Sequence, residues 1–435
     1  MTLRSALSCV LRSAVLTSAL SGCSGSLDSL GKDSAVPTTL GPTTKPTTYP
    51  NAFVTLAMRE PMEVRKKIDD TFQQLFVDGD TLTEAIYFEQ ADDQALIYDF
   101  LHTNVRTEGI GLGMLITVEL DQQGMFDRLW RYSKARLLQD SGPARGYFKS
   151  YCGEGIKGEK GTACYDVYGM QNFALALIFA HGRWGSTSAQ PYASDARALL
   201  DVLQNKELEN GGLMEVEDED QVTENVGSAF DPTTHLVREE PTGAAAGYYR
   251  SALEMPAAYE LWAQATGNTF WSEAADAARA HLAASADATT GLWPLRSYFD
   301  GSPVPDPPAP AFTGQAYRTQ LNLAIDALWG MAGADQTAVA KQTAVADSVL
   351  GFFSKQGPDQ YGASFTLDGT TIDPKPEKAL ISVNGALAVA SSRSDRAAFV
   401  KAVWAQAIPS GDTRYYDGLL YMMSLLVLSG QLQVY

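Results

Sequence analysis

One carboxylate in this sequence is followed by glycines at alternate positions: Glu108 precedes Gly109, Gly111 and Gly113. The chain then runs directly into an apolar stretch, 114–118, so we predict that Glu108 stands at the start of a buried helix. Alternate glycines make a poor helix start unless another part of the molecule must approach the backbone closely. Burial at such a place favours the protonated form of a carboxyl group and suits it to donate a proton. The alternative is a carboxylate that only stabilises the helix dipole.

The elements that must position this carboxylate are mainly helices. Apolar residues at helical spacing predict about twelve segments: 64–75, 85–100, 114–130, 173–180, 196–203, 255–265, 273–284, 321–331, 338–353, 383–390, 397–405 and 416–428. Short strands are expected near 212–217 and 363–367. The 173–180 segment is apolar on all sides, which is typical of an inner helix. Inner helices alternating with more polar ones predict a single all-α domain, an α/α toroid of two concentric rings over 51–435.

Composition restricts the partners of the chain. It has 435 residues, of which 45% are hydrophobic, and a formal net charge of −18. This charge argues against nucleic acid or anionic lipid as a direct partner. A neutral or basic ligand is compatible with it, and nothing in the sequence indicates the oligomeric state.

The N-terminus has the pattern of a targeting segment. Arg4 and Arg12 flank an apolar run too short to span a membrane, and Leu20-Ser21-Gly22-Cys23 is typical of a lipoprotein cleavage box. We therefore expect a signal peptide over 1–22, a lipidated Cys23 and a Ser/Thr/Pro-rich tether over 23–50. A plain secretory peptide is the alternative. Ser24 favours an outer-membrane location if the cell has an outer membrane.

The remaining cysteines predict a disulfide. Cys9 leaves with the signal peptide and Cys23 carries lipid, so Cys152 and Cys164 remain in an oxidising compartment with a Gly-rich segment between them. Their disulfide would stabilise the fold by about 3 kcal/mol. The four histidines stand apart, without zinc-type spacing, so we expect no metal site and no cofactor.

Segments that match a known family follow one another in order between about Ile86 and Tyr435: 104–109, 126–130, 173–177, 183–185, 259–262, 298–303, 316–318, 408–411 and 414–418. With them the chain resembles glycoside hydrolase family 8, and in particular the branch of exo-oligoxylanases that release xylose from the reducing end. The resemblance implies an (α/α)6 barrel of inverting enzymes that cleave β-1,4-linked glycans. Inversion requires two carboxyl groups about 6.5–9.5 Å apart, on opposite faces of the sugar.

The resemblance implies that Glu108 is the general acid and that Arg318 orients the site. The family usually has Asp-Ala-x-Arg where this chain has Gln315-Ala316-Tyr317-Arg318, so an amide stands at the position of the usual base. An amide can orient water but cannot take its proton. A further family acid, normally placed just before the helix at Phe173, is also absent in direct register.

Three interpretations follow for the missing base. It has moved to the loop that carries Asp300 and Asp306, of which Asp306 stands among prolines that could hold it rigidly. Alternatively Asp166, slightly early in register, enters the site. In the third interpretation the protein does not hydrolyse and is a membrane-tethered glycan-binding barrel.

Aromatic side chains are expected to stack on sugar rings. Tyr317, Tyr416 and Trp293 lie in or beside loops and are the main candidates, followed by Tyr415. Trp130, Trp184 and Trp262 lie within helical runs, where core packing is the better interpretation. With Arg318 and Gln315, the loop aromatics complete the expected substrate-binding set.

The sequence therefore predicts an extracytoplasmic, lipid-anchored or secreted inverting glycoside hydrolase. Its expected ligand is a β-1,4-linked oligosaccharide, with xylo-oligosaccharides favoured. The membrane is expected to contact the protein only through the N-terminal lipid.

Overall fold

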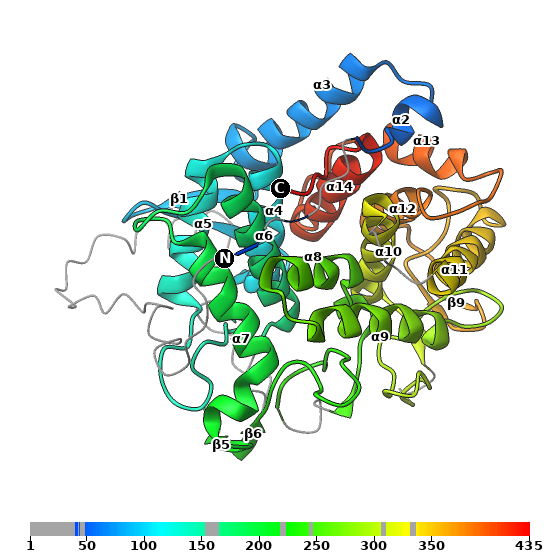
Figure 1. The fold of residues 1–435 in the computed structure, drawn as a ribbon. Coiled ribbons are helices and arrows are strands. Elements are labelled where there is room, and N and C mark those ends of the chain that lie inside the picture. The colour runs from blue at the N-terminus through cyan, green and yellow to red at the C-terminus, as the bar shows by residue number, and fades with distance from the viewer. Residues whose placement is uncertain are drawn as a thin grey trace, which may run out of the picture.

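Helices dominate the structure, a computed structural model that describes residues 40–41, 43, 48–152, 165–217, 223–242, 247–305, 310–330 and 336–435. Six helices pack side by side as a closed inner ring, in which the last also contacts the first. They are α4 (Thr107–Glu119), α6 (Val167–Trp184), α8 (Pro256–Thr266), α10 (Tyr317–Trp329), α12 (Lys378–Leu387) and α14 (Arg414–Ser429). Figure 1 shows them around the centre of the molecule.

A second ring of helices covers the first. Each outer helix follows its inner partner in the chain and packs against it, except α3, which comes first in the chain and packs on α14. The outer helices are α3 (Pro61–Phe72), α5 (Gln123–Arg136), α7 (Tyr192–Asn210), α9 (Phe270–Ser285), α11 (Gln336–Ser354) and α13 (Ala397–Ala405), and α2 (Ala52–Thr55) is a short helix before α3. The predicted all-α toroid of the (α/α)6 type is thus confirmed.

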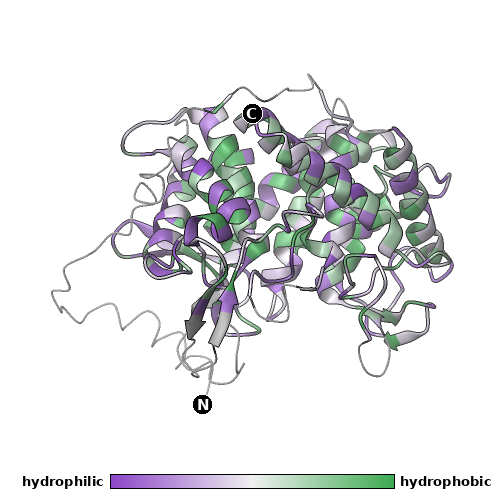
Figure 2. Ribbon diagram, turned by 60° about the horizontal axis from the view of Figure 1, so that its bottom comes forward, coloured by the Kyte–Doolittle hydropathy of each residue, from purple (hydrophilic) through white to green (hydrophobic). Residues whose placement is uncertain are grey.

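Burial explains why the inner helices are apolar on every side. In α4 every residue except Glu108 is buried, and in α14 every residue except Tyr416 is buried. Helices covered both by the outer ring and by their inner neighbours leave no face for polar residues. Figure 2 shows green, hydrophobic stretches along the helices and more purple in the connecting loops. The exceptions Glu108 and Tyr416 both lie in first turns, at one end of the ring.

Close approach of neighbouring elements explains the alternate glycines of α4. A Cβ atom at Gly109 would overlap the Tyr415 ring, and one at Gly111 would lie 2.8 Å from Cβ of Asn172. At Gly113 it would lie 3.0 Å from Ile97. The glycines therefore let α14, α6 and a strand pack directly on the α4 backbone, as the spacing predicted.

A four-stranded antiparallel sheet leads into α4, in the order β1 (Tyr87–Gln90), β2 (Gln94–Asp99), β3 (Asn104–Arg106) and β4 (Tyr151–Cys152). The predicted helical run over 85–100 is wrong, because β1 and β2 form a hairpin there. Gln90 pairs with Gln94, so the loop is 91–93, and Asp92 and Asp93 in it both have positive φ, 61° and 55°, a conformation that Asp tolerates better than most residues. The hairpin buries apolar residues of both strands against the core.

The other strands belong to two small sheets. β5 (Met214–Glu217) pairs with β6 (Thr223–Val226), and β7 (Ala311–Phe312), β8 (Ser364–Thr366) and β9 (Thr371–Asp373) form the second sheet. The short strands expected near 212–217 and 363–367 are confirmed by β5 and β8. The chain also forms a π-helical turn over Gln73–Val77 and 3₁₀ turns over Ser251–Leu253 and Gly314–Ala316.

The C-terminal segment closes the end of the ring opposite Glu108. The indole nitrogen of Trp329, the last residue of α10, donates to the carbonyl of Leu432 at 3.0 Å, and the backbone N–H of Gln433 donates to Glu119 at 3.0 Å. Part of the segment predicted as a tether also docks at this end. Gly41 donates to the Ala265 carbonyl at 2.7 Å, and Thr43 to the carbonyl oxygen of Tyr435 at 2.5 Å.

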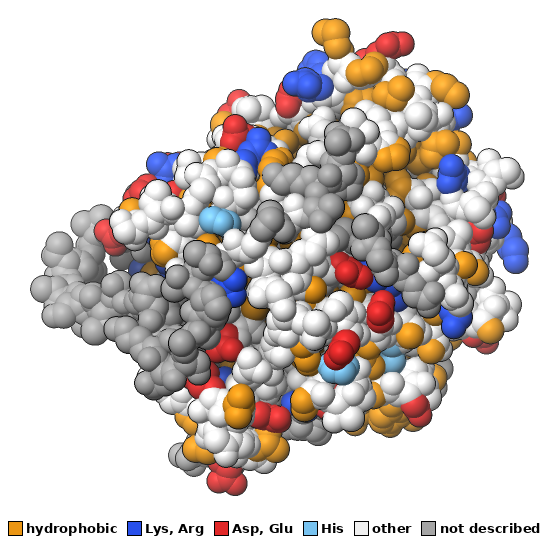
Figure 3. Space-filling view, in the orientation of Figure 1, with side chains coloured by type: hydrophobic (Ala, Val, Ile, Leu, Met, Phe, Trp, Pro, Cys, Tyr) orange, Lys and Arg blue, Asp and Glu red, His pale blue; other side chains and the backbone are white. Residues whose placement is uncertain are grey.

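Several sequence-based predictions lie outside the described residues. The signal peptide, Cys23 and most of the tether are among them, as is Cys164 of the predicted disulfide. Within the part of the chain that the structure describes, no helix is long and apolar enough to cross a bilayer. On the face shown in Figure 3, Lys and Arg side chains are scattered among Asp and Glu and form no basic patch.

The contact between Gly109 and Tyr415 gives a stability test. Gly109→Ala should lower the free energy of unfolding by about 1–3 kcal/mol, because the added methyl group forces the aromatic side chain of Tyr415 in α14 to move. Gly124→Ala in α5 is the matched control, since nothing lies within 4 Å of the added atom. Chemical denaturation measures both, and equal effects of the two substitutions would contradict the packing.

Candidate active site

The centre of the candidate site is an ion pair between two inner helices. Glu108, in the first turn of α4, contacts Nη1 of Arg318, in the first turn of α10, through its Oε2 atom. The Glu108 side chain is 20% exposed, whereas that of Arg318 is 4% exposed. The carboxylate therefore reaches solvent at the open end of the ring, and its partner, the Arg318 guanidinium, lies deeper in the protein.

Two tyrosines surround this ion pair. The Arg318 guanidinium lies 4.3 Å from the centre of the Tyr168 ring, a cation–π contact. Tyr416 is half-buried, and its hydroxyl donates to the Gly314 carbonyl at 2.6 Å. Burial raises the pKa of Tyr168 to about 12, so its hydroxyl stays protonated at neutral pH. Both rings come from the first turns of inner helices, α6 and α14.

Asp166 lies beside Glu108. It is the N-cap of α6, and its Oδ1 accepts the backbone N–H of Gly169 at 2.8 Å. Burial and the neighbouring Glu108 carboxylate raise the pKa of Asp166 to about 6. A Cβ atom at Gly169 would lie 2.7 Å from the Glu108 nitrogen, so this glycine lets α6 and α4 bring the two carboxylates together. The predicted candidate Asp166 is thus part of the site.

Gln315 lies in the helical turn just before α10 and is exposed. Its Oε1 accepts a hydrogen bond from Nη1 of Arg250, and Nη2 of the same arginine contacts the buried carboxylate of Glu239. Arg296 also donates to that Glu239 oxygen, at 2.9 Å and 2.7 Å. A chain of charged groups therefore fixes the Gln315 amide just before the start of α10.

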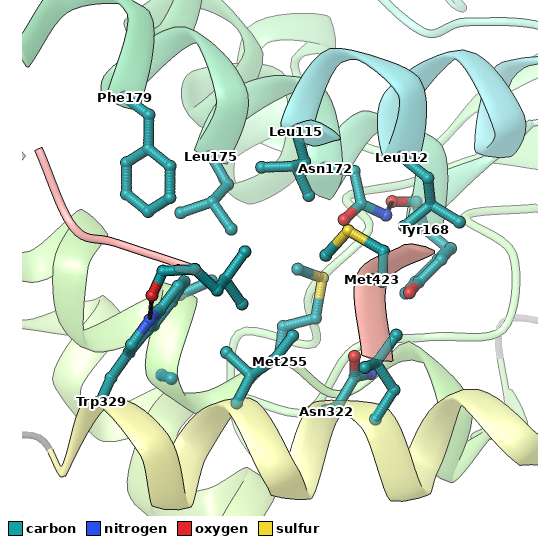
Figure 4. A pocket seen from close by; sticks show the side chains of 15 residues that line it. Leu112, Leu115, Tyr168, Asn172, Leu175, Phe179, Met255, Asn322, Trp329 and Met423 are labelled. Carbon is teal, nitrogen blue, oxygen red and sulfur yellow. Dashed lines mark hydrogen bonds between the residues drawn. The ribbon is translucent and has the colours of Figure 1, made fainter. Parts of the chain in front are cut away.

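An apolar cavity lies along the ring axis next to Tyr168. Figure 4 shows the side chains of Leu112, Leu115, Met255 and Met423 around it, with Asn172 beside Tyr168. Asn172 donates to the Tyr168 carbonyl at 2.9 Å. The lining contains the polar side chains of Tyr168, Asn172 and Asn322 but no carboxylate, so the carboxylate chemistry lies at the open end of the ring, beside Tyr168.

Two predicted stacking residues are corrected by the structure. Trp293 and Tyr317 are fully buried. The Trp293 indole donates to the Leu282 carbonyl at 2.9 Å, and the Tyr317 hydroxyl donates to the Ala363 carbonyl. Neither ring has a face open to a pyranose, because each packs in the core that the loops cover. Tyr416 remains a candidate.

The other expected residues are placed as follows. Trp130 and Trp262 are buried in the core as expected, and Trp184 is only partly buried. The expected stacking role of Tyr415 is wrong, because this side chain is buried against Gly109. Asp300 is exposed in a turn, where its Oδ1 accepts from the backbone and hydroxyl of Ser302. Asp306 lies outside the described residues. Among those that are described, no cluster of His, Cys, Asp and Glu is arranged to hold a metal ion.

Sequence reasoning did not find Tyr168, Glu239 and Arg250 as parts of the site. Arg250 and Gln315 are 65 positions apart and Arg296 and Glu239 are 57 apart, so no local spacing indicates their contact. The resemblance drew attention to Gln315 but gave no contact for it.

The fold and the site define a class of protein, the (α/α)6 toroids with a carboxylate held at the open end of the ring. Residues 96–430 match the family described as Glycosyl hydrolases family 8. This chain belongs to that family.

Relatives and solved structures agree with the assignment. The chain is 31% identical over 395 residues to a reducing end xylose-releasing exo-oligoxylanase of Halalkalibacterium halodurans, covering 89% of this chain and 94% of the relative. It is 31% identical to the corresponding enzyme of Paenibacillus barcinonensis, covering 89% and 97%. The structure of a GH8 xylobiose complex from Teredinibacter turnerae superposes with a TM-score of 0.80, at 29% identity over 89% of this chain and 98% of that one.

Proposed function

We propose that this protein releases xylose from the reducing end of β-1,4-linked xylo-oligosaccharides, by a single displacement that inverts the anomeric centre. The observation that carries the proposal is Glu108, the one residue of α4 that is not buried, held by Arg318 at the open end of the toroid. The names of the relatives support the substrate class. Glu108 protonates the leaving oxygen, and the buried guanidinium below it keeps the side chain in place.

Asp166 is our candidate for the general base. Of the two carboxylates favoured for this role, it is the one that the structure describes, and it lies at the same end of the ring as Glu108. A carboxylate whose pKa is near 6 is ionised at neutral pH and can still accept a proton from water.

We also propose that the mature protein is anchored outside the cytoplasm by lipid on Cys23. The support is the short apolar run of the N-terminus and the small residues before the cysteine. Cys23→Ser should move the protein from the membrane fraction to the soluble fraction of the cell that makes it. Retention of the variant in the membrane fraction would contradict the anchor.

Replacing Glu108 tests the acid. Glu108→Gln keeps the shape of the side chain but removes the proton, so release of xylose from xylotriose should fall by about 10²–10⁴-fold. With the wild-type protein, proton NMR during the first turnovers should show the α anomer at the new reducing end of the shortened oligosaccharide. Unchanged activity of the variant would remove Glu108 from the mechanism, and an initial β anomer would exclude inversion.

Replacing Asp166 tests the base through the pH profile. Because Asp166 acts in its ionised form, kcat/KM of the wild type should rise as the pH increases through about 6. In Asp166→Asn this rise should be lost, together with about 10²–10⁴-fold of the rate. If the variant keeps the wild-type profile, the base lies elsewhere.

A further inference from the structure

The part of the N-terminal segment that the structure describes lies on the closed end of the ring. Leu40 packs against the hydrophobic core. The backbone N–H of Gly41 donates to the carbonyl of Ala265, in the last turn of α8, at 2.7 Å. The Thr43 hydroxyl donates to the carbonyl oxygen of Tyr435 at 2.5 Å. The first described residues are therefore attached where inner helices end, opposite the open end.

These contacts continue as far as the start of α2. Tyr49 also packs against the hydrophobic core. A Cβ atom at Gly430, the residue that ends α14, would lie 2.8 Å from the carbonyl oxygen of Tyr49 and 2.9 Å from that of Pro50. The backbone before α2 therefore lies directly on the end of α14, and two inner helices, α8 and α14, hold the N-terminal segment at their last turns.

This attachment limits how a lipid-anchored chain can lie on a membrane. Residues 24–39 separate Cys23 from Leu40, and a chain of that length spans about 60 Å at full extension. A compact domain of the size of this one measures about 55 Å across. For the open end to rest on the bilayer, the linking chain would have to pass over the outer ring and along the depth of the molecule, a path of about 60–70 Å. Such a path uses all of the extension and removes nearly all of the conformational entropy of the linking chain.

We infer that the contacts of Gly41, Thr43 and Tyr49 hold the closed end of the ring toward the bilayer and turn the open end, with Glu108, away from it. The inference rests on the lipid anchor at Cys23, which is part of the proposed function. In this orientation the linking chain reaches the membrane without being stretched. The open end then receives oligosaccharides that are dissolved in the medium, whereas glycans attached to the same membrane lie on the other side of the ring.

Energy transfer to the membrane tests the orientation. The full-length lipidated protein is placed in liposomes that contain an acceptor-labelled lipid, and one of two exposed serines is replaced to carry the donor. Ser188→Cys lies in the loop after α6, at the closed end, and Ser410→Cys lies in the loop before α14, at the open end. Transfer from position 188 should exceed transfer from position 410 at least about twofold, because an inner helix about 20 Å long separates the two ends. The wild-type protein measures any labelling of Cys152 and Cys164.

The outcomes separate the inference from the anchor. Equal transfer from the two positions, or more from position 410, overturns the inference if the protein still floats with the liposomes, and the anchor then stands. A protein that does not float with the liposomes, and shows no transfer from either position, removes the anchor and the inference together. Neither measurement depends on catalysis, so the hydrolase activity is tested separately.

A further variant tests the contacts themselves. Gly41→Pro combined with Thr43→Val removes both hydrogen-bond donors, so the linking chain becomes longer and the ratio of the two transfers should fall toward one while flotation is unchanged. Thr48→Val is the matched control, because Thr48 is exposed in the same segment and makes no hydrogen bond to another described residue; it should keep the wild-type ratio. Circular dichroism checks that both variants are folded. A wild-type ratio in the folded double variant overturns the assignment of these contacts.

Discussion

The contact between Glu108 and Arg318 is the interaction on which the rest of the site depends. It joins α4 and α10, two inner helices that are not neighbours in the ring. A buried guanidinium without its carboxylate would be an uncompensated charge, which is strongly unfavourable. The inner ring must therefore keep the first turns of α4 and α10 close enough for Glu108 to contact Arg318. The outer helices and the loops pack around these two first turns.

Backbone contacts make this arrangement possible. Gly109 admits the Tyr415 ring, and Gly169 admits the backbone of Glu108. Larger residues at either place would push α4 away from α14 or α6 and move the carboxylate. At the opposite end, Gln433 and Trp329 tie the last residues of the chain to the ends of α4 and α10, so the ring opens to solvent where its helices begin.

The helical rings and the position of Glu108 could be predicted from the sequence, because helices buried on all sides consist almost entirely of apolar residues. The two concentric rings follow from apolar inner helices, and Glu108 follows from a carboxylate placed against glycines and a buried helix. The β1–β2 hairpin was missed because its apolar residues also fit a helical period. Asp92 and Asp93, which can adopt positive φ, were the signal for a turn.

Side-chain roles at the site were harder to predict. Trp293 and Tyr317 stand near loops in the sequence, yet other loops cover them, and no local pattern reveals such a cover. The chain of contacts from Gln315 through Arg250 to Glu239 joins three distant segments. Its members are polar residues without periodicity, so only the folded structure brings them into one group.

The most direct measurement of the central claim is a crystal structure of the Glu108→Gln variant with xylotriose bound. The account predicts that a glycosidic oxygen lies within about 3 Å of the side-chain amide at position 108, with the sugar at the open end of the ring above Arg318. Xylotriose bound elsewhere on the protein, or in this cleft with its glycosidic oxygens out of reach of position 108, would contradict it.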